Sequence, residues 1–210
     1  MWYNQYNEIR RRNDFMNVRL NDEYIPGTIL KKNDMGNVTG IDFLSKIFYI
    51  SDGVMLSQIR EISGIDGSTL QNWTKRGWVE NSKLKKYNID QVAHILIINM
   101  LRSCVQLDKI AFLMRYVNGS VDNRADDIIR YSALYDYICR ILEKLTSDDG
   151  PEHDISNLRA YVKEVTADYE EKVSGARRRL TNALEIIVAA YYAAIMKRYS
   201  EEKLEALMAQ

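Results

Sequence analysis

The chain has 210 residues, of which 46% are hydrophobic and 28% are charged. This composition excludes an intrinsically disordered chain, and the length suffices for one sizeable core or two small ones. The formal net charge is zero, so any nucleic-acid surface must be a local patch of cations. Only two prolines, Pro26 and Pro151, interrupt stretches that are otherwise free of helix breakers, and we therefore predict an all-α fold.

Neither the cysteines nor the apolar segments indicate a secreted or membrane protein. Cys104 and Cys139 lie inside apolar helical patterns and are expected to be reduced thiols. Residues 1–15 contain no apolar core of a secretion signal. The most apolar run, 183–196, is too short to span a bilayer comfortably. We therefore expect a cytoplasmic protein with no membrane partner.

By pattern, the chain divides into three regions. Residues 1–40 are polar and rich in Asn and Gly, and they are expected to form an N-terminal arm with one short helix near 6–17. Residues 41–119 hold a set of short elements. Residues 120–210 are expected to form a C-terminal helical region that serves dimerisation or sensing.

Helix signals follow one another closely in the middle region. Residues 56–63 form an amphipathic pattern that ends at Gly64, a helix-stop residue. Asp66 or Ser68 can cap the next helix, and Asn88 opens a later one with the spacing of a capping box. The expected elements are helices over 41–50, 56–63 and 67–76, a two-stranded wing near 78–87, and helices from 88 to about 100 and over 107–117.

Three longer helices are expected in the C-terminal region, over 124–145, 155–173 and 176–208. The middle of the last one, 183–196, is apolar on nearly all sides. A helix of this kind must be covered, either by helices of its own chain or by a second subunit. We expect a homodimer held mainly by this helix.

The helix over 67–76 divides its residue types between two faces. In the stretch GIDGSTLQNWTKRGW (64–78), Leu70 and Trp73 are expected to point inward. A helix that only fills a core does not need an opposite face of amides and cations, whereas a helix that enters a DNA major groove does. Amides can pair with adenine edges, and cations can reach phosphate or guanine. The residues of this face are Gln71, Asn72, Lys75 and Arg76.

A local excess of positive charge extends from this helix into the wing. Between Gln71 and Tyr87 there are five cations and a single anion, Glu80. In a chain of zero net charge, this asymmetry predicts a surface that contacts phosphates. The five cations are Lys75, Arg76, Lys83, Lys85 and Lys86.

These residues resemble the DNA-binding domain of MerR-type regulators, in which two short helices are followed by a basic wing and two further helices. Residues 69–70 and Trp73 match the start and an aromatic position of the family's second helix. Residues 77–79 match its glycine-apolar segment, and residues 84–87 (LKKY) stand where its wing has Y-R-R-Y. Over roughly 41–145, the sequence is more closely similar to an uncharacterised bacterial family, a domain of unknown function with a MerR-like fold. The resemblance implies a dimer that reads two half-sites of double-stranded DNA.

We therefore expect a DNA-binding transcriptional regulator with helix 67–76 in the major groove and the wing 81–87 on phosphates. The C-terminal helices would dimerise the chain or sense an effector of unknown identity. The expected DNA-binding residues are Ser68, Thr69, Gln71, Asn72, Lys75, Arg76, Lys83, Lys85, Lys86 and Tyr87.

Three departures from the MerR pattern leave a second hypothesis open. Gln71 stands where the family usually has an arginine, and Leu84 replaces the first tyrosine of the wing. Gly67 and Ser68 stand where the family often has a bulkier residue and a cation. In the second hypothesis, the chain is a helical protein-interaction module that retains a helix-turn-helix fold without binding DNA. The two hypotheses differ in what the wing must do, since a DNA binder needs the wing lysines exposed on the same side as Gln71 and Asn72.

Catalytic and metal-binding patterns are not evident in the sequence. The two histidines, His94 and His153, are not accompanied by a Cys/His pair, a metal-spaced cluster or a phosphate-cradling glycine loop. We expect no catalytic residues, no metal and no cofactor.

Overall fold

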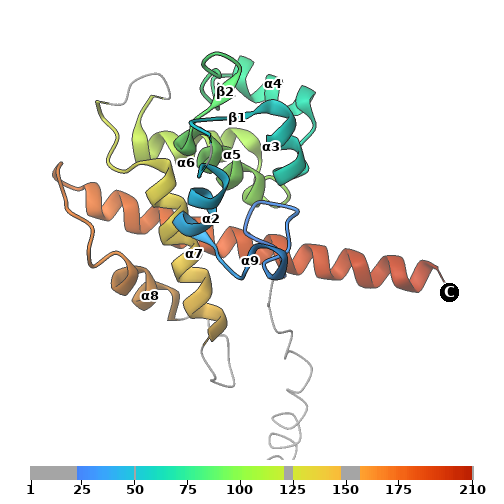
Figure 1. Ribbon diagram of the computed structural model, residues 1–210. Helices are drawn as coiled ribbons and strands as arrows, with labels where there is room; N and C mark the ends of the chain where they lie inside the picture. Colours follow the sequence, from blue (N-terminus) through green and yellow to red (C-terminus); the bar gives the residue numbers. More distant parts are fainter. Residues whose placement is uncertain (1–22, 50, 121–124, 148–156, 210) are drawn as a thin grey trace, which may run out of the picture.

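The helix α5 (Ile89–Leu101) lies at the centre of the chain and is buried along almost its whole length. Figure 1 shows the computed structural model, which describes residues 23–49, 51–120, 125–147 and 157–209. The other described elements are η2 (Asn33–Met35), α2 (Gly40–Ile47), β1 (Val54–Met55), α3 (Leu56–Ser63), α4 (Gly67–Lys75), β2 (Lys86–Tyr87), α6 (Leu107–Asn118), α7 (Tyr131–Ser147), α8 (Leu158–Val165) and α9 (Ala176–Met208).

The prediction of a mostly helical chain with a long apolar C-terminal helix is confirmed. Several local signals act as expected: Gly64, at φ 68°, ends α3, and Asn88 opens α5 by accepting a hydrogen bond from the Gln91 amide at 3.0 Å. The single sheet has two strands, β1 and β2, which pair antiparallel. The elements over 41–50, 56–63 and 107–117 are also helices.

One hydrophobic core runs from Ile25 to Ile195 and crosses the boundary that was expected near residue 120. Helices α7 and α9 both pack against α5. Part of the expected N-terminal arm also belongs to this core, because Ile25 is fully buried and residues 23–39 lie against the helices. The short helix expected near 6–17 lies outside the described residues.

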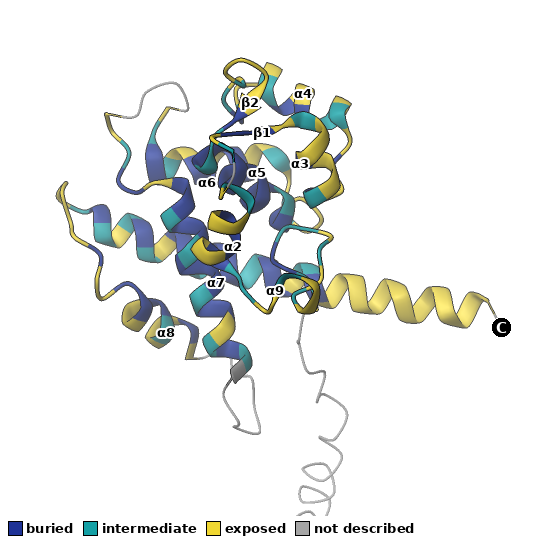
Figure 2. Cartoon of the chain, in the orientation of Figure 1, coloured by how far each residue is buried: buried dark blue, intermediate teal, exposed yellow. Residues whose placement is uncertain are grey.

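The apolar stretch of α9 is covered by the chain itself. Helices α5, α6, α7 and α8 all contact α9 (Figure 1), so residues 183–196 need no second subunit to cover them. This corrects the premise from which the dimer was expected. The distal turns after Ile195 leave the body of the molecule and are exposed (Figure 2). The buried residues of α9 are Ala176, Leu180, Ala183, Leu184, Ile187, Val188, Tyr191, Tyr192 and Ile195.

Among the described residues, α9 is the one helix long and apolar enough to cross a membrane by length and composition. Core helices of soluble proteins meet the same criteria, so the observation is weak evidence for a membrane span. In this fold, 44% of the most apolar window of α9 is buried inside the molecule.

The helix predicted over 155–173 is shorter than expected. Helix α8 ends at Val165, because the guanidinium of Arg177 donates hydrogen bonds to the carbonyls of Thr166, at 2.8 Å, and Tyr169. A continuing helix would need those carbonyls for its own amides. Tyr169 still reaches the core, where its hydroxyl donates to the Ile128 carbonyl at 3.0 Å.

The helix predicted over 124–145 also has different bounds, since α7 begins at Tyr131. Ile128 and Ile129 enter the core from the preceding loop. The Asn118 side-chain amide donates to the Ile129 carbonyl at 2.7 Å and holds this loop against α6.

The wing is a tight hairpin whose second strand pairs with a strand that precedes α3. Lys83 and Lys86 exchange backbone hydrogen bonds of 3.0 and 2.9 Å around a two-residue turn. Both turn residues, Leu84 and Lys85, have positive φ values of 50° and 62°. Two consecutive residues of positive φ are the requirement of a type I′ turn, which favours Asn and Gly. The prediction of a two-stranded wing within 78–87 missed β1 as the partner of β2.

A buried carboxylate joins α5 to the start of α7. Asp90 is 3% exposed and accepts hydrogen bonds from the Ser132 amide at 3.1 Å and the Ser132 hydroxyl at 2.6 Å. Its other oxygen accepts from the Arg130 guanidinium at 3.0 Å. Burial alone would raise the pKa of Asp90, but the hydrogen bonds from Ser132 and the contact with Arg130 outweigh it, so the pKa is lowered.

We predict that Asp90→Asn lowers the free energy of unfolding by about 2 kcal/mol, because a charged acceptor of buried hydrogen bonds is lost. Since the pKa of Asp90 is lowered in the folded state, its contribution is present above the unfolded-state pKa of about 3.9 and is lost as the pH falls through the folded value. Urea unfolding at pH 7 and at several pH values below 4 measures both effects, and the variant should lose less stability on acidification than the wild type. Asp108→Asn is the matched control, because Asp108 is also in the first turn of a helix but is exposed. Equal effects of both substitutions would contradict the role of Asp90.

The turn geometry gives a second prediction. Leu84→Asn combined with Lys85→Gly should raise the free energy of unfolding by about 1 kcal/mol, because both new residues adopt positive φ more readily. Urea unfolding at pH 7 checks this value. Ser82→Gly serves as the control: Ser82 lies beside the turn without a positive φ, so glycine there should destabilise the chain. A double variant no more stable than the wild type would argue against the turn.

Candidate nucleic-acid interface

Helix α4 is fixed to the core by one face and presents the other to solvent. Leu70 and Trp73 are buried in the core, as predicted. Gln71, Asn72 and Lys75 on the opposite side are exposed. The side chains that could reach a partner are therefore carried on a helix whose orientation is set by packing.

The start of α4 is held by Asp66, which settles the choice between the two predicted caps. Its carboxylate accepts the Thr69 amide at 2.8 Å and the hydroxyls of Ser68 and Thr69. Hydrogen bonds from Ser68 and then Thr69 lower the pKa of Asp66 well below its usual range, so it is ionised at neutral pH. Two of the expected DNA-binding hydroxyls are thus engaged within the helix cap, and Asp66 places a negative charge beside them.

A groove separates α4 from the wing. Its volume is ≈ 500 Å³, and it is bounded by α4, the first turn of α3 and the hairpin. Gln71 and Lys75 line it from α4, and Lys85 lines it from the tip of the wing. The structure therefore brings an amide and two cations from separate elements to one cavity. The other lining residues are Met55, Leu56, Ser57, Thr74, Asn81, Ser82 and Tyr87.

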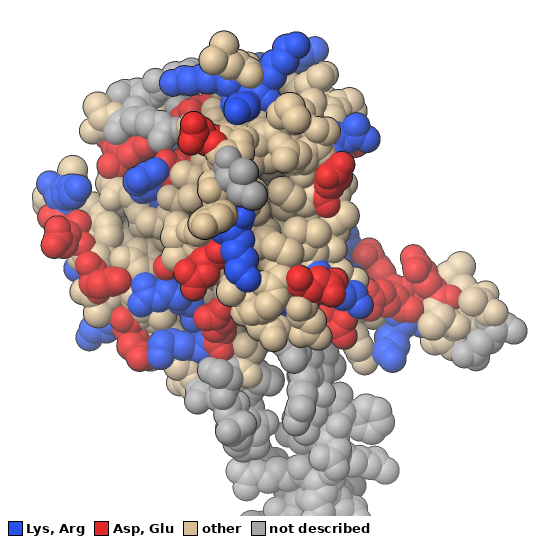
Figure 3. All heavy atoms as spheres, viewed as in Figure 1, with Lys and Arg blue, Asp and Glu red and all other residues tan. Residues whose placement is uncertain are grey.

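The lysines around the groove have no ion-pair partners in the part of the chain that the structure describes. Lys75, Lys83, Lys85 and Lys86 are exposed, and none of them forms an ion pair with a residue that the structure describes. Figure 3 shows Lys and Arg side chains gathered at the end of the molecule that carries α4 and the β2 hairpin. Such a concentration of cations in a neutral chain favours an anionic partner.

Arg76 lies at the edge of this surface. Its guanidinium stacks over the Trp78 ring, with the carbon Cζ 5.1 Å from the ring centre. A cation–π contact leaves the guanidinium hydrogen-bond donors available at the helix end. Arg76 is exposed, as the prediction required.

Two residues of the wing have contrasting exposure. Tyr87, one of the expected DNA-binding residues, is only 7% exposed and packs into the core, although it also lines the groove. Leu84, which was not among the expected site residues, is 97% exposed at the tip of the hairpin. The sequence signal for Leu84 was present, since an apolar residue flanked by three lysines cannot be drawn into a core without burying their charges.

The groove also contains residues that the sequence reasoning missed. Met55 from β1 is 51% exposed beside it, and Ser57 lines it from α3. A strand of two residues gives no periodic signal, so its pairing with β2 could not be read from the pattern. Within the described ranges, no cluster of three or more His, Cys, Asp or Glu side chains could hold a metal ion.

Comparison with known proteins gives a family but no described activity. The chain is similar to the uncharacterized protein YkrK of Bacillus subtilis (strain 168), with 27% identity over 117 residues, which are 54% of this chain and 50% of that protein. The chain therefore spans about half the length of this curated relative. No solved structure matches the chain. Residues 41–138 match the family model of a domain of unknown function, DUF1836. These residues hold α2 to α6, the groove and the first part of α7. The resemblance to an uncharacterised bacterial family is thereby confirmed, and this part of the chain is similar to the DUF1836 domain.

Proposed function

We propose that the chain is a cytoplasmic DNA-binding transcriptional regulator of the helix-turn-helix type, with a MerR-like arrangement of helices and wing. Helix α4 would lie in the major groove of double-stranded DNA, and the hairpin would contact the flanking phosphates. In this reading, Gln71 and Asn72 contact base edges, whereas Lys85 and Lys86 contact the backbone.

The observation that carries the proposal is the set of unpaired cations on both sides of one groove. Lys75 and Lys85 face the same cavity from different elements, and both are free of ion pairs with described residues. Phosphate contacts supply most of the sequence-independent affinity for DNA, and they require cations that are available in this way. Exposed amides beside them supply groups that can distinguish bases.

The alternative, a protein-interaction module, has its own support. Met55 lines the groove and Leu84 lies at the tip of the hairpin; both are large exposed apolar side chains that a protein partner would cover. The two functions predict different responses to salt, because displacement of counterions from phosphates makes DNA binding steeply salt-dependent.

We further propose a homodimer formed through the distal turns of α9, in place of the buried stretch first considered. Met196, Leu204 and Leu207 are exposed and fall on one face of the helix at 100° per residue. The pair Lys197–Glu201 flanks this face, and together with the pair Arg198–Glu202 it stabilises the projecting helix. Lys197 precedes Glu201 along the tail, so the flanking charges of two antiparallel tails would be opposite.

If the chain binds DNA, substitutions of phosphate-contacting and base-contacting residues should affect the affinity in different ways. Lys85→Ala with Lys86→Ala should weaken binding to specific and random duplexes alike, and reduce the slope of log K against log salt by about 0.9 per lost phosphate contact. Asn72→Ala should weaken binding to the preferred site by about 1–3 kcal/mol and change binding to random DNA little. Gel-shift titrations against genomic fragments at three salt concentrations measure both.

The matched control for charge is Lys163→Ala with Lys172→Ala, two exposed lysines at and beyond α8, away from the groove. This pair should leave the salt slope unchanged. If the wild-type chain binds no genomic fragment in a salt-dependent manner, the protein-interaction alternative replaces the proposal.

The dimer predicts a mass of twice 24.5 kDa in light scattering at micromolar concentration. Leu204→Lys with Leu207→Lys should give a folded monomer, because two charges are placed on the apolar face of the tail. Glu201→Lys with Glu205→Lys keeps that face and should weaken the dimer only at low salt, since it removes the opposite charges. A wild-type mass of 24.5 kDa would contradict the dimer.

A further inference from the structure

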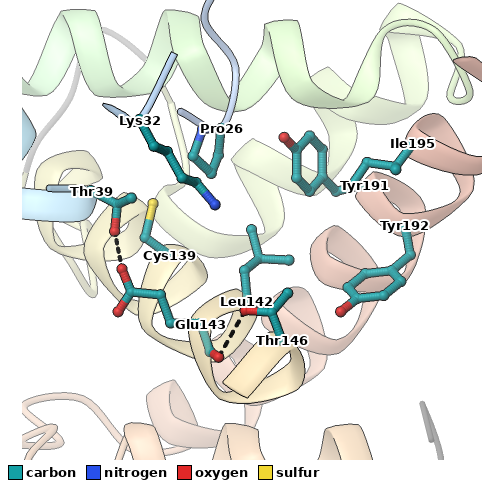
Figure 4. Close-up of a pocket in the computed structure, with 10 residues that line it drawn as sticks. All are labelled: Pro26, Lys32, Thr39, Cys139, Leu142, Glu143, Thr146, Tyr191, Tyr192 and Ile195. Carbon is teal, nitrogen blue, oxygen red and sulfur yellow. Dashed lines mark hydrogen bonds between the residues drawn. The ribbon is translucent and has the colours of Figure 1, made fainter. Parts of the chain in front are cut away.

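A pocket lies on the other side of α5 from the groove, between α7, α9 and the segment that precedes α2 (Figure 4). The space between its lining atoms is ≈ 350 Å³ with its open side included, of which ≈ 20 Å³ is wide enough for the centre of a water molecule. The enclosed part therefore has room for about one water-sized group, and the rest of a ligand would lie along the open side. Its apolar wall is formed by Pro26, Leu142, Tyr191 and Ile195.

The Tyr192 hydroxyl is a buried donor that has no hydrogen-bond partner among the residues that the structure describes. Tyr192 is 8% exposed, lines the pocket, and is drawn with its ring beside Leu142 and Thr146 in Figure 4. Buried hydroxyls without a partner are uncommon in folded proteins. Burial raises the pKa of Tyr192 to about 12, so the group keeps its proton at neutral pH and remains a donor.

Lys32 brings a positive charge to the same pocket. Its side chain extends toward the interior of the pocket in Figure 4, and it forms no ion pair with a described residue. The neighbouring Lys31, by contrast, pairs with Glu23 at 3.5 Å. Among the described residues, no carboxylate thus forms an ion pair with this ammonium group beside the apolar wall.

None of the described polar groups of the pocket forms an ion pair with Lys32. Glu143 also lines the pocket, and its carboxylate accepts a hydrogen bond from the Thr39 hydroxyl instead. Thr146 donates its hydroxyl proton to the Glu143 carbonyl at 3.0 Å. Burial raises the pKa of the Cys139 thiol to about 12, so it is not an anion at neutral pH.

We propose that this pocket binds a small monocarboxylate with a slender apolar body, its carboxylate on the Lys32 ammonium and the Tyr192 hydroxyl and its body against Leu142 and Ile195. A single cation and one hydroxyl match one carboxylate, whereas a phosphate dianion would need further donors. A ligand amine would be repelled by Lys32.

The wall of the pocket is also attached to the part of the chain that carries the groove. Pro26 lines the pocket. The carbonyl of the next residue, Gly27, accepts a hydrogen bond from the side-chain amide of Asn99 at 2.9 Å. The same amide donates to the Ser63 carbonyl, at the end of α3, at 2.9 Å. The Ile29 amide donates to the Ile62 carbonyl at 2.9 Å. A ligand that moves residues 26–29 therefore acts on the end of α3, as an effector would.

Isothermal titration calorimetry of the full-length chain tests the proposal without reference to DNA. The probes are sodium hexanoate and sodium benzoate, with hexanamide and hexylamine as matched compounds lacking the negative charge. We expect one carboxylate to bind per chain. The amide and the amine should bind with affinities at least about tenfold lower. Lys32→Met should weaken hexanoate binding about tenfold, and Tyr192→Phe several-fold, because each removes one donor and keeps the shape of the side chain.

Lys31→Met is the control, since it removes an adjacent positive charge outside the pocket, and it should leave hexanoate affinity unchanged. Both pocket variants remove a polar group without burying a new one, and their circular dichroism and thermal unfolding should match the wild type. The proposal is overturned if neither carboxylate binds saturably, if hexanamide binds as tightly as hexanoate, or if Lys31→Met weakens binding as much as Lys32→Met. Retained affinity in both Lys32→Met and Tyr192→Phe also overturns it.

Discussion

The arrangement of this chain depends on the burial of α5 on nearly every side. A helix without a solvent face must satisfy all its polar side chains inside the molecule, and each partner then fixes a neighbouring element. Asp90 holds the start of α7 through Ser132. Gln91 donates from its amide to the Asn81 carbonyl at 2.9 Å and so holds the base of the wing. About two turns further on, the Asn99 side chain holds both the segment before α2 and the end of α3.

The burial of α5 also explains why the elements on both sides of the groove are fixed while their charged side chains stay exposed. Trp73 packs into the core and sets the orientation of α4, while Gln91 sets the root of the hairpin. The backbone positions on both sides of the groove are thus determined by the interior. The lysines that line it have no part in the packing and stay in water, so they are available to a partner at no loss of internal contacts.

The features that the sequence predicted correctly are those decided within a few residues. Gly64 ends α3 because glycine adopts positive φ, and Asn88 with Gln91 caps α5 by contacts three residues apart. The exposed face of α4 follows from its own 3.6-residue period. The errors came from contacts between distant residues: β2 pairs with β1 across more than 30 positions, and Arg177 ends α8 from another helix. Whether the apolar stretch of α9 meets its own chain or a second copy is likewise decided by the tertiary packing of four other helices.

The same central helix connects the two recesses of the molecule. Near its N-terminus, Gln91 donates a hydrogen bond to the wing. Near its C-terminus, Asn99 donates a hydrogen bond to the segment that lines the pocket. Coupling between two sites requires an element that can take two positions, and a helix buried on all sides is a poor candidate. Residues 26–29 are a better one, because a few hydrogen bonds hold this segment and it touches both the pocket and the end of α3. Any signal from the pocket would therefore pass beside α5 and not through it, by way of Ile29 and Ile62 into the helix pair that carries the exposed amides.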